Sequence, residues 1–103
     1  MIIYNVTVSV DYEIVQDWME WMKEVHIPDV MATGKFIDYK VLKVYGQNGD
    51  TAMSFAIQYT CENVNLLNEY MTQNAPALQK EHNDRYGDKA VGFRTVLQIL
   101  EDF

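Results

Sequence analysis

Residues 2–10 alternate between an apolar set and a mostly small and polar set. One set is formed by Ile2, Tyr4, Val6, Val8 and Val10, and the other by Ile3, Asn5, Thr7 and Ser9. A period of two over this length predicts a β-strand with one fully apolar face. The other face is mostly small and polar, which suits either solvent or a second sheet.

The apolar positions then change to a helical spacing. They are Ile14, Trp18, Trp21, Met22 and Val25, opposite Asp17, Glu20, Lys23 and Glu24. This pattern predicts an amphipathic helix that begins after Asp11, a suitable N-cap. Pro28 disfavours helical geometry at Ile27, so we expect the helix to break at residues 26–28, resume briefly and stop at Gly34.

The remaining chain contains three more strand patterns and one helical pattern. Strands are expected over residues 36–45, 51–61 and 90–100, with a hairpin turn at residues 46–50. The second helix is expected to begin at Asn63, to kink or split at residues 74–76 and to end at Gly87. This order predicts one ferredoxin-like domain over residues 1–103: an α+β, βαββαβ fold with a four-stranded antiparallel sheet and both helices on one face.

Such an arrangement leaves the second face of the sheet uncovered. The strands place several apolar residues on this face, and an exposed apolar face of this size would make a monomer prone to association. Face-to-face pairing of two sheets would bury it, so we expect a homodimer, a dimeric α+β barrel. Arg94, within the otherwise apolar residues 93–97, would then form an ion pair with an acidic residue of the second copy, or else bind an anion.

Composition narrows the classes of function. The net charge is −7, and the eight Lys and Arg residues are scattered, so no basic face for nucleic acid or an anionic membrane is expected. No apolar stretch approaches membrane-spanning length, and the first residues lack a signal-peptide pattern, so a cytoplasmic protein is expected. Cys61 is the only cysteine and is expected to be a buried hydrophobic residue.

His26 is the main candidate for chemistry. It directly precedes the expected helix break, and a break opens room between a helix and a sheet. There it could act as a general base or as a hydrogen-bonding group for a substrate. The alternative is a capping or half-buried structural histidine.

The residues around His26 are candidates for a ligand-binding cleft. Trp18, Trp21 and Met22 could line a pocket for a flat apolar or aromatic molecule, although core packing is the alternative for all three. Tyr39 and His82 are the further neighbours that such a site would need. His82 follows Leu78 by four positions and is otherwise a core or rim histidine.

Other kinds of site have no support in the sequence. Neither histidine has a carboxylate at a metal-binding spacing, and no glycine loop for phosphate or nucleophilic triad is present. No metal and no cofactor are therefore expected. The expected partners are a second copy and a small-molecule ligand. The alternative function is a non-catalytic protein-interaction or regulatory module, whose cleft would be filled by Trp18 and Trp21.

Several short motifs together resemble a known family. They are residues 1–7, Trp18-x-x-Trp21-Met22, His26-Ile27-Pro28, Thr33-Gly34-Lys35-Phe36, Gln58-Tyr59, Ala75-Pro76-Ala77-Leu78, Gly87-Asp88-Lys89 and residues 93–97. The chain resembles a bacterial family of unknown function, family 4286, and is more distantly similar to the dimeric α+β barrel superfamily, which includes cofactor-free antibiotic-biosynthesis monooxygenases. The resemblance implies a ferredoxin-like protomer and a sheet-to-sheet homodimer. It implies no activity, since members of the superfamily use different groups in the same cleft.

Overall fold

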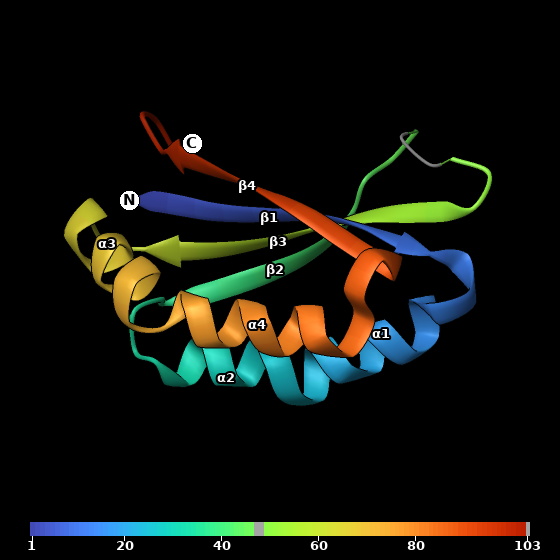
Figure 1. Ribbon diagram of the computed structural model, residues 1–103. Helices are drawn as coiled ribbons and strands as arrows, with labels where there is room; N and C mark the ends of the chain where they lie inside the picture. Colours follow the sequence, from blue (N-terminus) through green and yellow to red (C-terminus); the bar gives the residue numbers. More distant parts are fainter. Residues whose placement is uncertain (47–48, 103) are drawn as a thin grey trace.

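The computed structural model describes residues 1–46 and 49–102, which form a four-stranded antiparallel sheet with helices on one face (Figure 1). The strands are β1 Ile2–Asp11, β2 Asp38–Lys43, β3 Ala52–Cys61 and β4 Ala90–Gln98. Their order across the sheet is β2-β3-β1-β4, and each neighbouring pair is antiparallel. This topology confirms the predicted ferredoxin-like fold.

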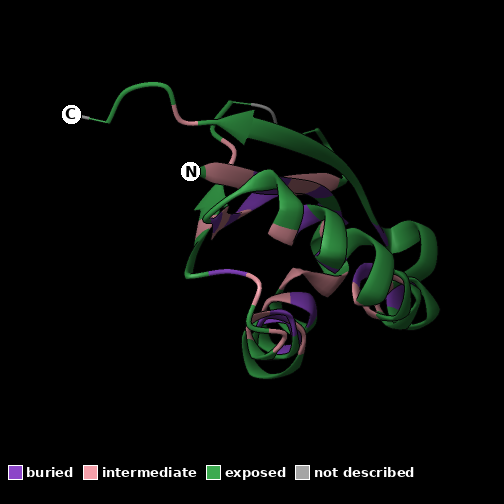
Figure 2. Cartoon of the chain, turned by 90° about the vertical axis from the view of Figure 1, so that its left-hand side faces the viewer, coloured by how far each residue is buried: buried purple, intermediate pink, exposed green. Residues whose placement is uncertain are grey.

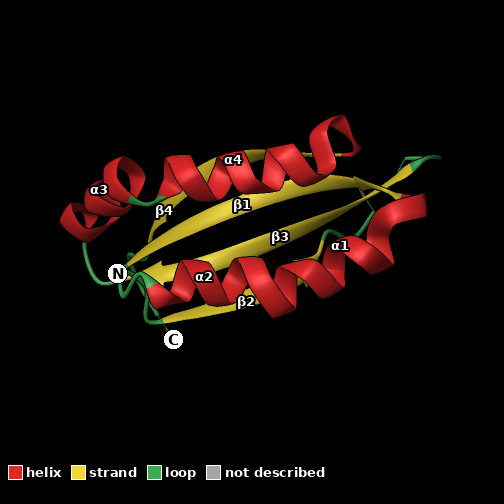
Figure 3. Ribbon diagram, turned by 60° about the horizontal axis from the view of Figure 1, so that its bottom comes forward, coloured by secondary structure: helices red, strands yellow, loops and turns green. Residues whose placement is uncertain are grey.

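The helices form two arms that run side by side across one face of the sheet, which lies behind them in Figure 3. The first arm comprises η1 Tyr12–Ile14, α1 Val15–Trp21, the π turn η2 Met22–His26 and α2 Ile27–Ala32. The second arm comprises α3 Val64–Gln73, α4 Ala75–Tyr86 and η3 Gly87–Lys89. Within residues 1–46 and 49–102, no helix combines the length and the apolar character needed to cross a membrane.

The first arm differs from the prediction in two places, at its N-terminal cap and at residues 26–28. Asp11 does not cap the helix with its side chain, because a 3₁₀ turn precedes α1. The break expected at residues 26–28 is also absent. Instead the Ile27 N–H bonds to the Met22 carbonyl, five residues back, and the helix continues into α2 with Pro28 in its first turn. Proline carries no N–H, and the wider π turn accommodates it without ending the helix.

The π turn changes which residues of the first arm face the sheet. Val25, expected on the apolar stripe, is 36% exposed, whereas Ile27 and Val30 are each 1% exposed. The extra residue in the π turn rotates every later side chain about the helix axis. A prediction that assumes about 3.6 residues per turn throughout does not include this rotation. Trp18, Trp21 and Met22, which precede this shift, are buried as the stripe predicts.

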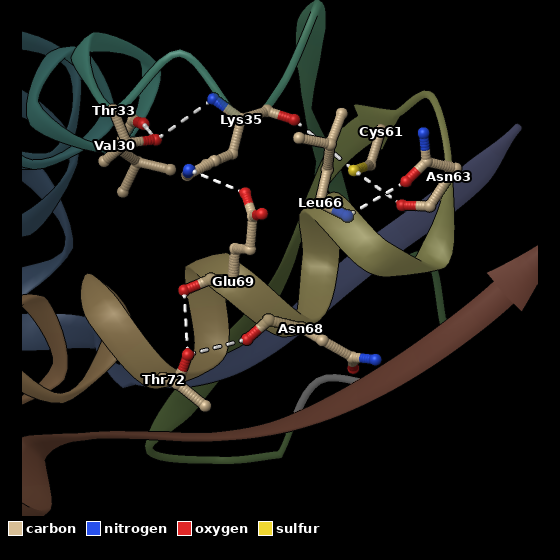
Figure 4. Close-up of polar contacts among 9 residues, drawn as sticks. All are labelled: Val30, Thr33, Lys35, Cys61, Asn63, Leu66, Asn68, Glu69 and Thr72. Atoms are coloured by element: carbon tan, nitrogen blue, oxygen red, sulfur yellow. Dashed lines mark hydrogen bonds and ion pairs between the residues drawn. The ribbon is translucent and has the colours of Figure 1, made fainter.

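The second arm follows the sequence signals closely. The Asn63 side chain accepts a hydrogen bond of 2.9 Å from the Leu66 N–H and caps α3 (Figure 4). The helix divides at Asn74, with Pro76 in the first turn of α4, and it ends at Gly87, whose φ is +55°. The predicted cap, split and glycine stop are therefore confirmed.

Three strands are shorter than expected, β3 by a single residue. β2 covers only Asp38–Lys43, and Phe36 turns into the core instead. Single hydrogen bonds continue the pairing with β3, from the Ile37 N–H to the Thr60 carbonyl and from the Val44 N–H to the Ser54 carbonyl. β4 ends at Gln98. In the turn expected at residues 46–50, Gln47 and Asn48 lie outside the described residues.

The core lies between the sheet and the two arms, and β4 is exposed along most of its length (Figure 2). The alternation predicted for β1 holds, since Tyr4, Val8 and Val10 are buried on the face toward the helices. Cys61 is also buried, and its thiol donates to the carbonyls of Lys35 and Asn63, each at 3.3 Å (Figure 4).

Candidate functional site

A cavity of about 270 Å³ lies between the sheet and the two helical arms. Its floor is largely apolar and includes Val6 and Val8 of β1 and Ile57 of β3. Its walls include Met22, His26 and Val30 from the first arm, and Leu78 and His82 from the second. The cavity therefore lies beside the π turn, where the sequence led us to expect an opening.

His26 is the last residue of the π turn and is partly buried in the cavity wall. Its ring stacks on Trp21 at a centroid distance of 5.3 Å and lies 5.8 Å from the ring of His82. Burial lowers the pKa of His26 from 6.5 to about 4, with His82 and Arg94 acting in the same direction and Asp29 opposing them. At neutral pH the ring is therefore uncharged and able to accept a proton.

One ring nitrogen of His26 lacks a hydrogen-bond partner. Nδ1 is buried and makes no hydrogen bond within residues 1–46 and 49–102. A buried polar atom without a partner costs about 1–3 kcal/mol. A ligand group that reached this nitrogen would recover part of that cost.

His82 is held in one orientation by a core tryptophan. The indole N–H of Trp18 donates to His82 Nε2 at 3.0 Å. Since Nε2 accepts, the proton of the neutral ring resides on Nδ1. Burial lowers the pKa of His82; a hydrogen bond with the Asn83 side chain opposes this shift, and the charge of Arg94 adds to it.

A cluster of aromatic rings closes one side of the cavity. Tyr4 packs against Phe36, Tyr59 and Tyr70, with centroid distances of 6.0, 6.1 and 5.7 Å. Burial raises the pKa of Tyr59 and of Tyr70, and neighbouring tyrosines raise both further. Their hydroxyls therefore remain protonated at neutral pH and can donate hydrogen bonds.

Arg94 supplies the positive charge on the cavity lining. It pairs with Val6 across the β1–β4 ladder, and its Nε–H donates to the Tyr4 hydroxyl oxygen at 3.0 Å. The side chain thus lies on the face toward the helices. The ion pair with a second copy that we expected across the open face of the sheet does not fit this placement.

The predicted ligand-binding residues divide into two groups. Met22, His26 and His82 line the cavity together. Trp18 lies behind His82, completely buried, and Trp21 lies behind His26, where it packs beneath the Arg85 guanidinium at 5.3 Å. Tyr39, opposite Tyr59 on β2, is 45% exposed and outside the lining. Both tryptophans therefore position histidines and do not themselves form the wall.

The lining also includes residues that were not on our list of ligand-binding candidates, among them Tyr4, Tyr70 and Arg94. An arginine inside an apolar strand was the available signal for Arg94, but its face depends on the β1–β4 register. Tyr70 had the helical spacing of a core residue, which does not distinguish a cavity wall from solid packing.

No group of three or more His, Cys, Asp or Glu side chains is close enough to hold a metal ion within the described part of the chain. The lining instead offers two neutral imidazoles, phenol hydroxyls and one guanidinium. Such groups can bind an organic molecule, orient it and exchange a proton with it.

Fold and cavity together define a ferredoxin-like α+β protein with a helix–sheet pocket. A family model for a domain of unknown function, DUF4286, matches residues 1–100, and the chain belongs to this family. No curated protein matches the chain in sequence.

Solved structures share the fold at low sequence identity. An ethyl tert-butyl ether d (EthD) family protein from Bacillus halodurans is 16% identical with a TM-score of 0.67, and the match covers 97% of this chain and 100% of that one. SnoaB, a cofactor-independent oxygenase from Streptomyces nogalater, solved as a mutant, is 7% identical with a TM-score of 0.60, covering 98% and 95%. A dimeric ferredoxin-like protein from an uncultured marine organism is 10% identical with a TM-score of 0.54, covering 99% and 98%.

Proposed function

We propose that this protein binds a small, largely aromatic molecule in the cavity between its sheet and its helical arms, with His26 as a hydrogen-bonding group or general base. The observation that carries the proposal is the cavity itself, which is open beside a neutral, partly buried histidine. An apolar floor with a few converging polar groups is the usual composition of a small-molecule site.

The volume limits the size of the ligand. An apolar cavity of about 150 Å³ is large enough to bind benzene. At about 270 Å³, this cavity has room for a ligand with one or two rings. Larger polycyclic molecules would have to extend through the mouth.

Catalysis at this site would depend on proton transfer. The lining groups are acids, bases and hydrogen-bond donors, so a reaction carried by them begins with removal of a proton from the ligand by His26. SnoaB, which shares the fold, is described as a cofactor-independent oxygenase. A substrate that readily loses a proton is therefore the kind to test for turnover.

The ligand-binding proposal is tested by thermal shift with a panel of one- and two-ring aromatic compounds. Ligand at about one hundred times its Kd adds about 2.7 kcal/mol of stability, which raises the Tm of a domain this size by roughly 10 °C or more. Val6→Phe fills the floor and should abolish the shift, and His26→Ala should reduce it.

Val64→Phe is the matched control, since Val64 is an exposed residue of α3 outside the cavity. It should respond to ligand as the wild type does. The proposal fails if no compound raises the Tm of the wild type, or if Val6→Phe responds as strongly as the wild type.

The open face of the sheet supports a second proposal, a homodimer. Leu42, Val91, Phe93 and Leu97 are each at least 40% exposed, and the strand pairing places them on the face away from the helices. A second copy of the same sheet would cover them. A purely non-catalytic interaction module would also use such a face, but a cavity that Trp18 and Trp21 leave open favours ligand binding.

A further inference from the structure

The distribution of charge and apolar surface in the cavity indicates the chemical class of its ligand. Arg94, Val6 and Ile57 lie in one row across three neighbouring strands, because Val6 pairs with Arg94 on one side and with Ile57 on the other. The row therefore begins at a cation on the edge strand and continues as an apolar floor. With neighbouring strands about 4.8 Å apart, it spans roughly 10 Å.

The charge of Arg94 is not balanced inside the cavity. No Asp or Glu lines the cavity, and Arg94 forms no ion pair with any carboxylate in residues 1–46 and 49–102. Its field reaches across the site, since it lowers the pKa values of His26, His82 and Tyr70. Both histidines are neutral at pH 7, so the empty cavity carries one net positive charge in a chain whose net charge is −7.

The hydrogen bond to Tyr4 orients the guanidinium for recognition. Its Nε–H donates to the Tyr4 oxygen at 3.0 Å, and its two terminal nitrogens donate no hydrogen bond within the described residues. A guanidinium whose terminal N–H groups are free can bind a carboxylate through two parallel hydrogen bonds.

We propose that the ligand is an aromatic carboxylic acid of one or two rings, whose carboxylate pairs with Arg94 and whose rings lie over Val6 and Ile57. This inference rests on the proposed function and adds the class of ligand. The single charge and the small volume favour a monoanion over a nucleotide or a multiply phosphorylated compound.

The test compares 2-naphthoate with 2-naphthamide, its neutral analogue of the same shape, by isothermal titration calorimetry. A hydrogen bond to a charged group is worth about 1.5–3 kcal/mol, so naphthoate should bind about 10- to 100-fold more tightly to the wild type. Arg94→Gln should remove this preference and leave the affinity for naphthamide nearly unchanged. Arg94→Lys should restore only part of it.

Lys23→Gln is the matched control. It removes one positive charge from an exposed helix position outside the cavity, so it should keep the preference for naphthoate. Melting curves of each variant confirm that it is folded.

The possible outcomes distinguish failure of the carboxylic-acid inference from failure of the ligand-binding function. If naphthamide binds as tightly as naphthoate, the inference fails and the aromatic-ligand function stands. A preference for naphthoate that survives Arg94→Gln also overturns the inference. If neither compound binds the wild type, the inference fails, and the ligand-binding function fails with it when no compound of the aromatic panel raises the Tm.

Discussion

Burial of the His26 ring, together with the nearby His82 and Arg94, strongly favours its neutral form in the folded protein. In the unfolded chain the same ring has an ordinary pKa near 6.5. Between pH 6.5 and about 4 the unfolded state therefore binds more protons, and stability falls as the pH falls. Above pH 6.5 both states are neutral and His26 has no such effect.

The first prediction concerns this pH range. His26 should reduce the free energy of unfolding by about 3 kcal/mol between pH 6.5 and 4. Urea unfolding of the wild type and of His26→Gln at several pH values measures the effect. Carboxylates that titrate in the same range cancel in the difference between the two proteins. Parallel stability curves for the two proteins would show that the pKa of His26 is not lowered.

Single residues also show what the sequence could reveal about the site. Met22, His26 and His82 lie at helical spacings that direct them toward the sheet, and all three line the cavity. The sequence could not reveal that Trp18 holds His82, because this contact joins residues 64 positions apart. Nor could it assign Arg94 to the inner face, since that depends on strand register.

Among the elements, the π turn is the one whose position the sequence indicated but whose geometry it did not predict. Pro28 indicated a disturbance of the helix, and we expected a break. The structure keeps the helix continuous through a π turn, in which the Ile27 N–H bonds to the carbonyl of the fifth preceding residue rather than the fourth. By contrast, the cap at Asn63 and the stop at Gly87 depend on local chemistry alone, and both were predictable.

The prediction at the scale of the elements concerns the cap of α3. Asn63→Ala removes the acceptor of the Leu66 N–H and should destabilise the protein by about 1 kcal/mol. Chemical denaturation measures the change, with Asn65→Ala, an exposed position inside α3, as the control. Equal stabilities of the two variants would mean that the cap contributes nothing.

For the whole molecule, the uncovered face of the sheet is the main open feature. The order of elements predicted the four-stranded sheet with helices on one side, because alternating and helical periods are local and strong. The same order leaves one face without a cover from this chain's described residues (Figure 1). One solved structure with this fold is described as a dimeric ferredoxin-like protein.

The prediction at this scale is that Phe93→Glu disrupts the dimer. Phe93 is 64% exposed near the middle of β4, and a carboxylate there would be buried at the proposed interface without a partner. Sedimentation should show the wild type at twice the mass of one chain and the variant at the mass of one. Val64→Glu, on the helical side, should remain dimeric. A monomeric wild type at micromolar concentration would contradict the proposal.

The central claim is that the cavity beside His26 binds a small aromatic ligand, and an NMR titration tests it most directly. The imidazole resonances of His26 and His82 are followed while 2-naphthoate, and separately 2-naphthamide, is added to the wild type. We expect saturable shifts of both rings, together with the methyl groups of Val6 and Ile57, and no comparable shifts on the open face of the sheet. Unchanged imidazole resonances with both compounds, or shifts confined to the open face, would contradict it.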